Sequence, residues 1–279
     1  MEPAALRALV ERALAEDAPA GDLTTDLVVG ERTRCRAELQ AKADGVLAGT
    51  AVAQAAFEVA AEQDGLGPVS VAWRAADGAA VRQGDVVAVV EGPARTVLRA
   101  ERVAINFLAH LSGVATLTRA FAEAARPARV LCTRKTTPGL RELEREAVAA
   151  GGGELHRASL SEAVLVKDNH LRVAGGLAEA VRRARASGHP VEVEAETREE
   201  VEEALAAGAD RILLDNPTPD LVRWAVERVG DPERLEVSGG VTLDSLPLLV
   251  EAGARVISVG RITHSAPSLD LSLEVTDVW

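Results

Sequence analysis

The strongest constraint on the fold of this chain is the regular alternation of short apolar runs with helical segments between residues 130 and 259. The apolar runs are three to four residues long, as expected of buried strands, and helical stretches lie between most of them. Strands that alternate with helices at this spacing form right-handed βαβ units and a parallel sheet. Six strands are clear, and a weaker seventh strand is left undecided. This number favours an α/β barrel over an open sheet. The predicted strands are 130–132, 163–166, 191–193, 212–214, 235–237 and 256–259.

The first hundred residues follow a different pattern, in which short strand-like runs alternate with turns. This mixture predicts an α+β domain with an antiparallel sheet. A long helix over 100–125, apolar at helical spacing, is predicted to link this domain to the barrel. The other predicted elements are strands 36–42, 69–74 and 86–91 and helices 1–17 and 49–61.

Charge and composition exclude several classes of partner. The net charge is −12, and an acidic protein does not generally attract a polyanion, so we expect no nucleic acid partner. Only Cys35 and Cys132 are present, which makes a disulfide framework or a thiolate zinc site improbable. We find no signal peptide and no apolar stretch of membrane-spanning length, so we expect a cytoplasmic protein without a membrane partner.

Polar residues or glycines follow every predicted strand of the barrel. In a parallel barrel the active site forms at the carboxyl ends of the strands, so these residues are expected to meet on one rim. They are Thr133, Arg134 and Lys135; Lys167, Asp168, Asn169 and His170; Glu194; Asp215 and Asn216; Ser238, Gly239 and Gly240; and Gly260 and Arg261.

The basic residues of this rim, together with two that lie just before the second strand, indicate an anion-binding site. Arginine binds a carboxylate or phosphate with two parallel hydrogen bonds, and lysine supplies a point charge. Internal ion pairing with Glu142, Glu144 or Glu146 is the alternative interpretation. This cationic group comprises Arg134, Lys135, His156, Arg157 and Lys167.

The remaining rim residues form an acidic group and a glycine group. Glu194 and Asp215, on adjacent strand ends, suit a hard divalent cation or sugar hydroxyls; a surface pair, or partners for nearby cations, is the alternative. Glycine lets backbone N–H groups approach an oxyanion, and the last strand ends of barrels commonly hold a phosphate. The glycine group, Ser238, Gly239, Gly240 and Gly260, therefore favours phosphate binding over a simple turn.

The motifs of the whole chain resemble those of one family, the quinolinate phosphoribosyltransferases, also called carboxylating nicotinate-nucleotide pyrophosphorylases. TRKTTPG followed by VKDNH is highly specific for this family. The motifs, in chain order, are EDAPAGDLTT (16–25), ERVAINFLAHLSGVAT (101–116), TRKTTPGLR (133–141), HR (156–157), VKDNHL (166–171), VEVE (191–194), AGADRILLDN (207–216) and EVSGGV (236–241).

The resemblance implies a fold, a reaction and an assembly. The fold is an N-terminal α/β sandwich over 1–108 and a TIM-like α/β barrel with fewer than eight strands over 109–267, and residues 268–279 return toward the first domain. The reaction converts quinolinate and 5-phosphoribosyl-1-pyrophosphate, with Mg²⁺, into nicotinate mononucleotide, pyrophosphate and carbon dioxide. The assembly is a homodimer, or a larger assembly of dimers, in which Arg102 of one subunit enters the site of the other.

The resemblance also implies a role for each site residue. Thr133, Arg134, His156, Arg157 and Lys167 would bind the carboxylates of quinolinate, and Lys135 would contact the phosphoribosyl donor. Glu194 and Asp215 would bind the ribose hydroxyls and magnesium, and act with Lys135 in catalysis. The glycine group would hold the 5-phosphate.

One residue departs from the family pattern, and three other functions stay open. Arg211 stands where family members often have an apolar residue; because it precedes the core of its strand, we expect it to have no consequence. The alternatives are an aldolase-like enzyme that uses Lys135 or Lys167 as a Schiff-base nucleophile, a paralogue with a different acceptor, and a ligand sensor without turnover.

Overall fold

The structure is a computed structural model that describes all residues, 1–279, and it divides into two compact units. The first unit comprises Met1–Leu117, Glu142–Gly151 and Ala266–Trp279, and the second comprises Thr118–Arg141 and Gly152–Ser265. The domain limits given above, at residues 108 and 267, stay a prediction.

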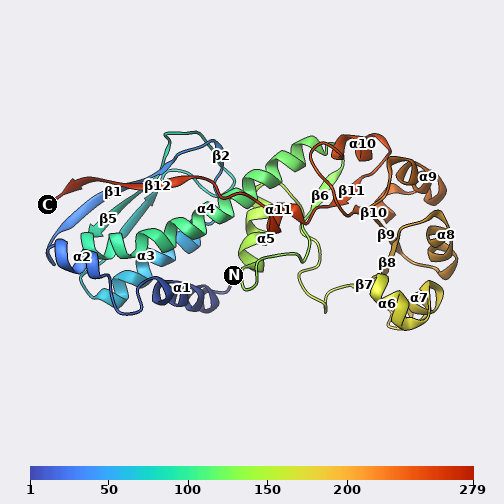
Figure 1. The fold of residues 1–279 in the computed structure, drawn as a ribbon, viewed down its shortest axis with the longest axis horizontal. Helices are drawn as coiled ribbons and strands as arrows, with labels where there is room; N and C mark the ends of the chain where they lie inside the picture. Colours follow the sequence, from blue (N-terminus) through green and yellow to red (C-terminus); the bar gives the residue numbers. More distant parts are fainter. The chain divides into compact units, whose positions relative to one another are not determined.

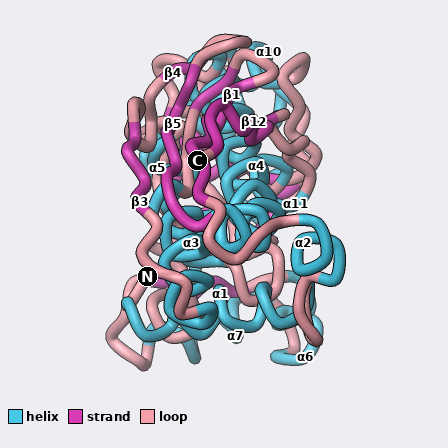
Figure 2. Tube along the Cα trace, turned by 90° about the vertical axis from the view of Figure 1, so that its left-hand side faces the viewer, coloured by secondary structure: helices cyan, strands magenta, loops and turns pink.

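The first unit is built on a four-stranded antiparallel sheet in the order β12-β1-β5-β3. Its strands are β1 (Arg34–Ala41), β3 (Ser70–Trp73), β5 (Val86–Pro93) and β12 (Leu271–Val278), which lie side by side in Figure 2. Burial alternates along β1, as expected of a strand with one face on the core. Because β12 pairs with β1 along its whole length, the last residues of the chain belong to the first sheet.

Helices cover one face of this sheet (Figure 1). They are α1 (Pro3–Asp17), α2 (Leu23–Val28), α3 (Thr50–Asp64) and the start of α4 (Ala94–Ala124), and α5 (Arg141–Ala150) belongs mostly to the same unit. A two-stranded ribbon of β2 (Gly45–Val46) and β4 (Ala80–Val81) completes the unit. The expected antiparallel sheet and long helix are both present, and α4 starts six residues earlier than predicted.

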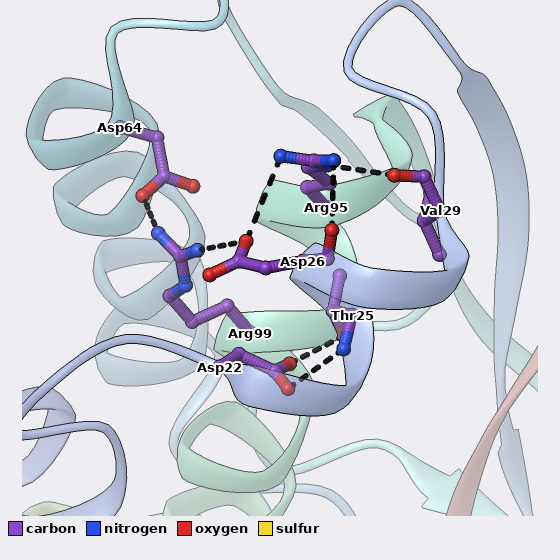
Figure 3. A network of polar contacts seen from close by, with 7 residues as sticks. All are labelled: Asp22, Thr25, Asp26, Val29, Asp64, Arg95 and Arg99. Atoms are coloured by element: carbon purple, nitrogen blue, oxygen red, sulfur yellow. Dashed lines mark hydrogen bonds and ion pairs between the residues drawn. The ribbon is translucent and has the colours of Figure 1, made fainter.

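A polar network fixes α2 beside α3 and α4 (Figure 3). Asp22 caps α2 by accepting hydrogen bonds from the backbone N–H of Thr25 at 3.0 Å and from its hydroxyl at 2.5 Å. The Thr25 hydroxyl, together with that N–H, holds the pKa of Asp22 below its ordinary value. Arg95 donates to the carbonyls of Asp26 and Val29, and Arg99 bonds Asp26 and Asp64. Part of the EDAPAGDLTT motif therefore has a structural role in this chain.

The second unit is a six-stranded parallel sheet in the order β6-β11-β10-β9-β8-β7. Its strands are β6 (Arg129–Leu131), β7 (Val164–Val166), β8 (Val191–Ala195), β9 (Arg211–Asp215), β10 (Leu235–Ser238) and β11 (Val256–Ser258). The first strand pairs with the last, which is the cyclic order of a barrel. The prediction of a barrel with fewer than eight strands is thus confirmed, with six strands rather than seven.

The barrel stays open between β6 and β7, which share no hydrogen bonds. On the β6 side, Glu154 forms an isolated parallel bridge with Leu131, with backbone hydrogen bonds to Val130 and Cys132. The chain therefore lays a short extended segment along this edge just before His156.

Helices surround the strands on the outside of the second unit (Figure 1). Local signals explain their ends: Thr197 and Glu200 form a capping box at the start of α8, and Gly208 and Gly230 end α8 and α9 in left-handed conformations. These elements are α6 (Asp168–Ala174), α7 (Leu177–Arg185), α8 (Arg198–Ala207), α9 (Pro219–Val229), the 3₁₀ turn η1 (Pro232–Arg234), α10 (Leu246–Glu251) and α11 (Arg261–His264). None of the helices is both long enough and apolar enough to cross a membrane.

Gly113 lets the carboxyl-terminal segment cross α4 at close range. A Cβ atom on this residue would lie 2.0 Å from the carbonyl oxygen of Pro267 and 3.0 Å from the Cα of Ser268. Both of these are backbone atoms, so no side-chain rotation can relieve the overlap.

We therefore expect Gly113→Ala to lower the free energy of unfolding by about 1–3 kcal/mol, because the added methyl group forces two backbone segments apart. Ala124→Ser, which enlarges an exposed side chain of the same helix, should change it by less than about 0.5 kcal/mol. Urea unfolding measures both variants. A Gly113→Ala midpoint equal to that of the unchanged protein would contradict the close contact.

Candidate active site

A cavity of about 530 Å³ opens at the carboxyl ends of the barrel strands. Thr133 and all members of the cationic, acidic and glycine groups line it, as the strand order requires. Four residues of the expected rim do not line it: Asp168, Asn169, His170 and Asn216. Arg102 lies on α4, in the first unit, where it is 60% exposed and pairs with Glu101 at 3.7 Å. The roles assigned to these residues remain predictions.

Hydrogen bonds fix the loop that follows β6 and carries Arg134 and Lys135. The guanidinium of Arg141 donates to the carbonyls of Arg134 and Ala158 and to the hydroxyl of Thr136. The hydroxyl of Thr263 donates to the carbonyl of Lys135 at 2.7 Å. The TRKTTPGLR motif therefore supplies both cavity residues and, in Arg141, the group that holds their backbone.

Two of the basic side chains that line the cavity, Arg134 and Arg157, lie close enough for their charges to interact. Burial, and after it the neighbouring charge of Arg134, lower the pKa of Arg157. Arg157 also donates to the carbonyl of Ala163 at 3.0 Å, which fixes its position. Two of the acids considered as internal partners, Glu142 and Glu146, pair with the amino terminus. This side of the cavity is thus suited to a ligand with more than one negative charge.

The acidic side of the cavity contains Glu194 and Asp215. Glu194 is 6% exposed and accepts a hydrogen bond from the Nζ atom of Lys167 at 2.5 Å. Burial, and then the nearby charge of Glu194, raise the pKa of Asp215, while Lys167 and Lys135 act in the opposite direction. Carboxylate oxygens of Glu194, Glu196 and Asp215 lie within 4.8 Å of one another, a donor set that fits a hard divalent cation such as Mg²⁺.

The glycine group lies on the β10 and β11 side of the cavity and depends on left-handed backbone. Gly239 has a φ of +88°, and a Cβ atom there would lie 2.5 Å from Oδ1 and 2.7 Å from the backbone nitrogen of Asn216. Asn216 itself has a φ of 49° and donates its N–H to the carbonyl of Ser238 at 2.8 Å. Only glycine allows the ends of β9 and β10 to approach this closely.

Comparison with known proteins gives the same family over the two parts of the chain. Residues 22–112 match the model of the quinolinate phosphoribosyl transferase N-terminal domain, and residues 114–274 match that of the C-terminal domain.

The chain belongs to the quinolinate phosphoribosyltransferase family.

Individual relatives agree with this assignment. A Bacillus subtilis protein named probable nicotinate-nucleotide pyrophosphorylase [carboxylating] is 43% identical over 97% of this chain and 93% of its own length. The chloroplastic nicotinate-nucleotide pyrophosphorylase [carboxylating] of Arabidopsis thaliana is 39% identical over 97% of this chain and 82% of its own. The solved structure of the Francisella tularensis nicotinate-nucleotide pyrophosphorylase has a TM-score of 0.91 and 34% identity, and the match covers 99% of this chain and 98% of the other.

The structure adds site residues that the sequence did not single out. Glu192 and Glu236 are buried beneath the cavity, and His156 and Arg211 face both of them. The alternation along VEVE and EVS was an available signal, because Glu192 shares a face with Glu194, and Glu236 shares one with Ser238. The expectation for Arg211 is corrected: it is the first residue of β9, and its side chain faces two buried carboxylates.

Substitution of two glycines can distinguish the cost of steric overlap from the cost of backbone strain, because both have a positive φ but only one has close neighbours. Gly230 has a φ of +75° with no atom within 4 Å of the place that a Cβ would take, whereas Gly239 combines a φ of +88° with a close approach to Asn216. We expect Gly230→Ala to cost about 1–2 kcal/mol of stability from strain alone. Gly239→Ala should cost more and should also weaken the binding of inorganic phosphate.

Chemical unfolding and calorimetric titration with phosphate measure the two effects. Equal stability losses, with unchanged phosphate affinity in both variants, would show that the contact between Gly239 and Asn216 does not shape the cavity.

Proposed function

We propose that this chain transfers the phosphoribosyl group of 5-phosphoribosyl-1-pyrophosphate to quinolinate, with loss of carbon dioxide, in the biosynthesis of NAD. The products are nicotinate mononucleotide and pyrophosphate. The observation that carries the proposal is that one cavity combines a cationic side, a pair of carboxylates and a glycine-lined backbone. A dicarboxylate acceptor and a phosphorylated sugar donor together require all three.

The acceptor half of the site is the cationic side. Quinolinate carries two carboxylates on adjacent ring carbons, so its recognition calls for several positive groups at short range. Arg134, His156, Arg157 and Lys167 line the cavity and can supply them, with Thr133 beside them as a hydroxyl donor. The lowered pKa of Arg157 supports this assignment, because burial and then the charge of Arg134 disfavour its charged form, and a carboxylate of the substrate would favour it again.

The donor half is formed by the acidic and glycine groups. Glu194 and Asp215 would bind ribose hydroxyls and magnesium, and Ser238, Gly239, Gly240 and Gly260 would hold the 5-phosphate. Lys135 lies against Gly260, where a Cβ atom would be 3.1 Å from its Cδ, so its ammonium can reach the phosphate side of the cavity. Magnesium, when bound, would offset negative charge on the pyrophosphate oxygens.

The chemistry needs positioning and electrostatics rather than a general base. The pyridine nitrogen displaces pyrophosphate from C1 of the ribose, and positive charge develops on the sugar as the bond to oxygen breaks. The carboxylates of Glu194 and Asp215 stabilise that charge, and the ammonium of Lys135 stabilises the departing pyrophosphate. The ring nitrogen is then quaternary and accepts electron density, so the C2 carboxylate leaves as carbon dioxide and C2 takes up a proton.

We further propose that the enzyme is a homodimer, or an assembly of dimers, in which Arg102 enters the partner's site, and that it works in the cytoplasm. The exposed position of Arg102 supports this, because its guanidinium is available to a second subunit. The apolar side chains of α2 also support a second copy: Leu23, Leu27 and Val28 are 76%, 75% and 74% exposed on a helix that Arg95 and Arg99 hold in place.

The aldolase-like alternative is less consistent with the contacts. A Schiff-base lysine must lose its proton, whereas the ammonium of Lys167 donates to the buried carboxylate of Glu194. A ligand sensor would not require the acceptor and donor halves in one cavity.

Removal of Arg134 tests the acceptor assignment. Arg134→Ala should lower kcat/KM for quinolinate about 30- to 150-fold, corresponding to the loss of about 2–3 kcal/mol from a charged hydrogen-bonded contact. The release of carbon dioxide from carboxyl-labelled quinolinate, with donor and Mg²⁺ present, measures it. Arg223→Ala, which removes an exposed guanidinium on α9, should stay within about twofold of the unchanged enzyme. No release from the unchanged enzyme, or near-normal kinetics of Arg134→Ala, would contradict the proposal.

Complementation tests the role of Arg102. Arg102→Ala and Glu194→Gln should each be nearly inactive. A co-expressed heterodimer of the two should recover about half of the activity, because one of its two sites then lacks both substitutions. A heterodimer of Glu194→Gln with Asp215→Asn is the control and should recover none, since both residues belong to the barrel of one subunit. If the first heterodimer is as inactive as the control, Arg102 does not act across the dimer.

A further inference from the structure

The interior of the barrel contains a layer of acidic side chains directly beneath the cavity. Side chains alternate along a strand, so Glu192 shares its inward direction with Glu194, and Glu236 shares its own with Ser238. Glu192 is 8% exposed and Glu236 is 1% exposed. Two carboxylates at this depth require opposite charges close by, because an uncompensated charge in a protein interior is strongly unfavourable.

Two cations face these carboxylates from different elements. The Nε2 atom of His156 lies 3.2 Å from Oε2 of Glu236 and 3.7 Å from Oε2 of Glu192. On β9, which pairs with both neighbouring strands, the guanidinium of Arg211 lies 3.8 Å from Glu236 and 3.9 Å from Glu192. With both carboxylates ionised, the four groups sum to zero charge only when the imidazole of His156 is protonated.

The same groups leave the ring of His156 in a defined position. It lines the cavity, yet its Nε2 atom is directed at the two acids, and the segment that carries it is tied to β6 by the bridge between Glu154 and Leu131.

We propose that Glu192 and Glu236 are positioning residues for His156, which hold its ring as an imidazolium and so provide a fixed positive charge for a carboxylate of the substrate. Arg211 compensates the second negative charge of the acid pair. The part of the proposal that concerns the substrate rests on the function proposed above; the part that concerns the charge of the ring does not.

The electrostatics agree with this geometry. The contacts with Glu192 and then with Glu236 raise the pKa of His156 to about 9, against the opposing effect of burial. Burial disfavours ionisation of Glu236, but His156, Ser258 and Arg211 together outweigh it and lower the pKa of that carboxyl. The same cavity contains other charged groups of both signs: the cations Arg134, Lys135 and Arg157, the acid Asp215, and Glu194, which is paired with Lys167.

The direction of the pH dependence follows from the raised pKa. The ring carries its charge at neutral pH and loses it as the pH rises through about 9. Its contribution to stability is complete below pH ~6.5, the ordinary histidine value, and is lost between there and about 9. A divalent cation between His156 and the two acids would lie beside the guanidinium of Arg211, so the structure favours a proton at this position.

The test is a titration of the five histidines by NMR in isotopically labelled protein, with the His156 signal assigned from His156→Gln. We expect a pKa near 9 for His156 in the unchanged protein, and a fall of at least one unit in Glu236→Gln and in Glu192→Gln. Glu202→Gln is the matched control, since it removes an exposed carboxylate that pairs with Arg228 on the outside of the barrel. Two Gln variants are used so that one remains if the other does not fold.

Kinetics supply a second test, because a purely structural role of the two acids would not make the change in KM depend on pH. In the Gln variants, the KM for quinolinate at pH 8 should rise about twofold for a one-unit fall in the pKa of His156 and about tenfold for a two-unit fall. At pH 6 it should stay close to normal, because the ring is then mostly protonated in any case. A KM that rises equally at both pH values would overturn the positioning role.

The two proposals fail in different ways. A His156 pKa near 6.5 in the unchanged protein, or one that neither Gln variant shifts, overturns this inference even if carbon dioxide is released from quinolinate. Conversely, if His156 titrates as expected but no carbon dioxide is released, the charge assignment stands and the proposed reaction falls.

Discussion

The structure of the second unit depends on one constraint: charges held inside a small barrel must be balanced by other charges. Six strands leave little interior volume, and this protein fills part of it with glutamates where aliphatic side chains would be usual. Each buried acid has a cationic neighbour: Glu194 has Lys167, and Glu192 and Glu236 share His156 and Arg211. Two of the cations that line the cavity, His156 and Lys167, are therefore held by buried acids before any substrate arrives.

This arrangement explains how an acidic protein maintains a cationic site. The overall charge of −12 has little bearing on the cavity, because the local balance is set by side chains within a few ångströms of one another. The lowered pKa of Arg157 and the raised pKa of Asp215 arise at opposite sides of the same cavity, in each case from burial and then from a like charge close by. Such opposed shifts are typical of a site that binds an anion at one side and a cation or a sugar at the other.

Much of this organisation could be predicted from the sequence, because periodicity and strand ends depend on local chemistry. All six barrel strands were located to within about two residues, and most of the residues expected at their ends line one cavity. The inner layer was not predicted, since a glutamate in a strand is ordinarily assigned to the solvent face, and only the closed curvature of the sheet directs Glu192 and Glu236 inward. Arg211 was misjudged for the same reason: its importance depends on the neighbours that it meets across strands, and these are far away in the sequence.

The missing hydrogen bonds between β6 and β7 have a consequence for how such a site can arise. In a fully closed barrel every wall position is a strand residue, committed by its backbone to its neighbours. Here a loop borders the gap, and its consecutive residues His156 and Arg157 both contribute side chains to the cavity. In a strand at the same position, only every second side chain would point inward. The gap between β6 and β7 thus provides binding side chains that a closed barrel would lack. Substitutions in the loop at this gap could alter acceptor preference without disturbing the hydrogen bonds of the sheet.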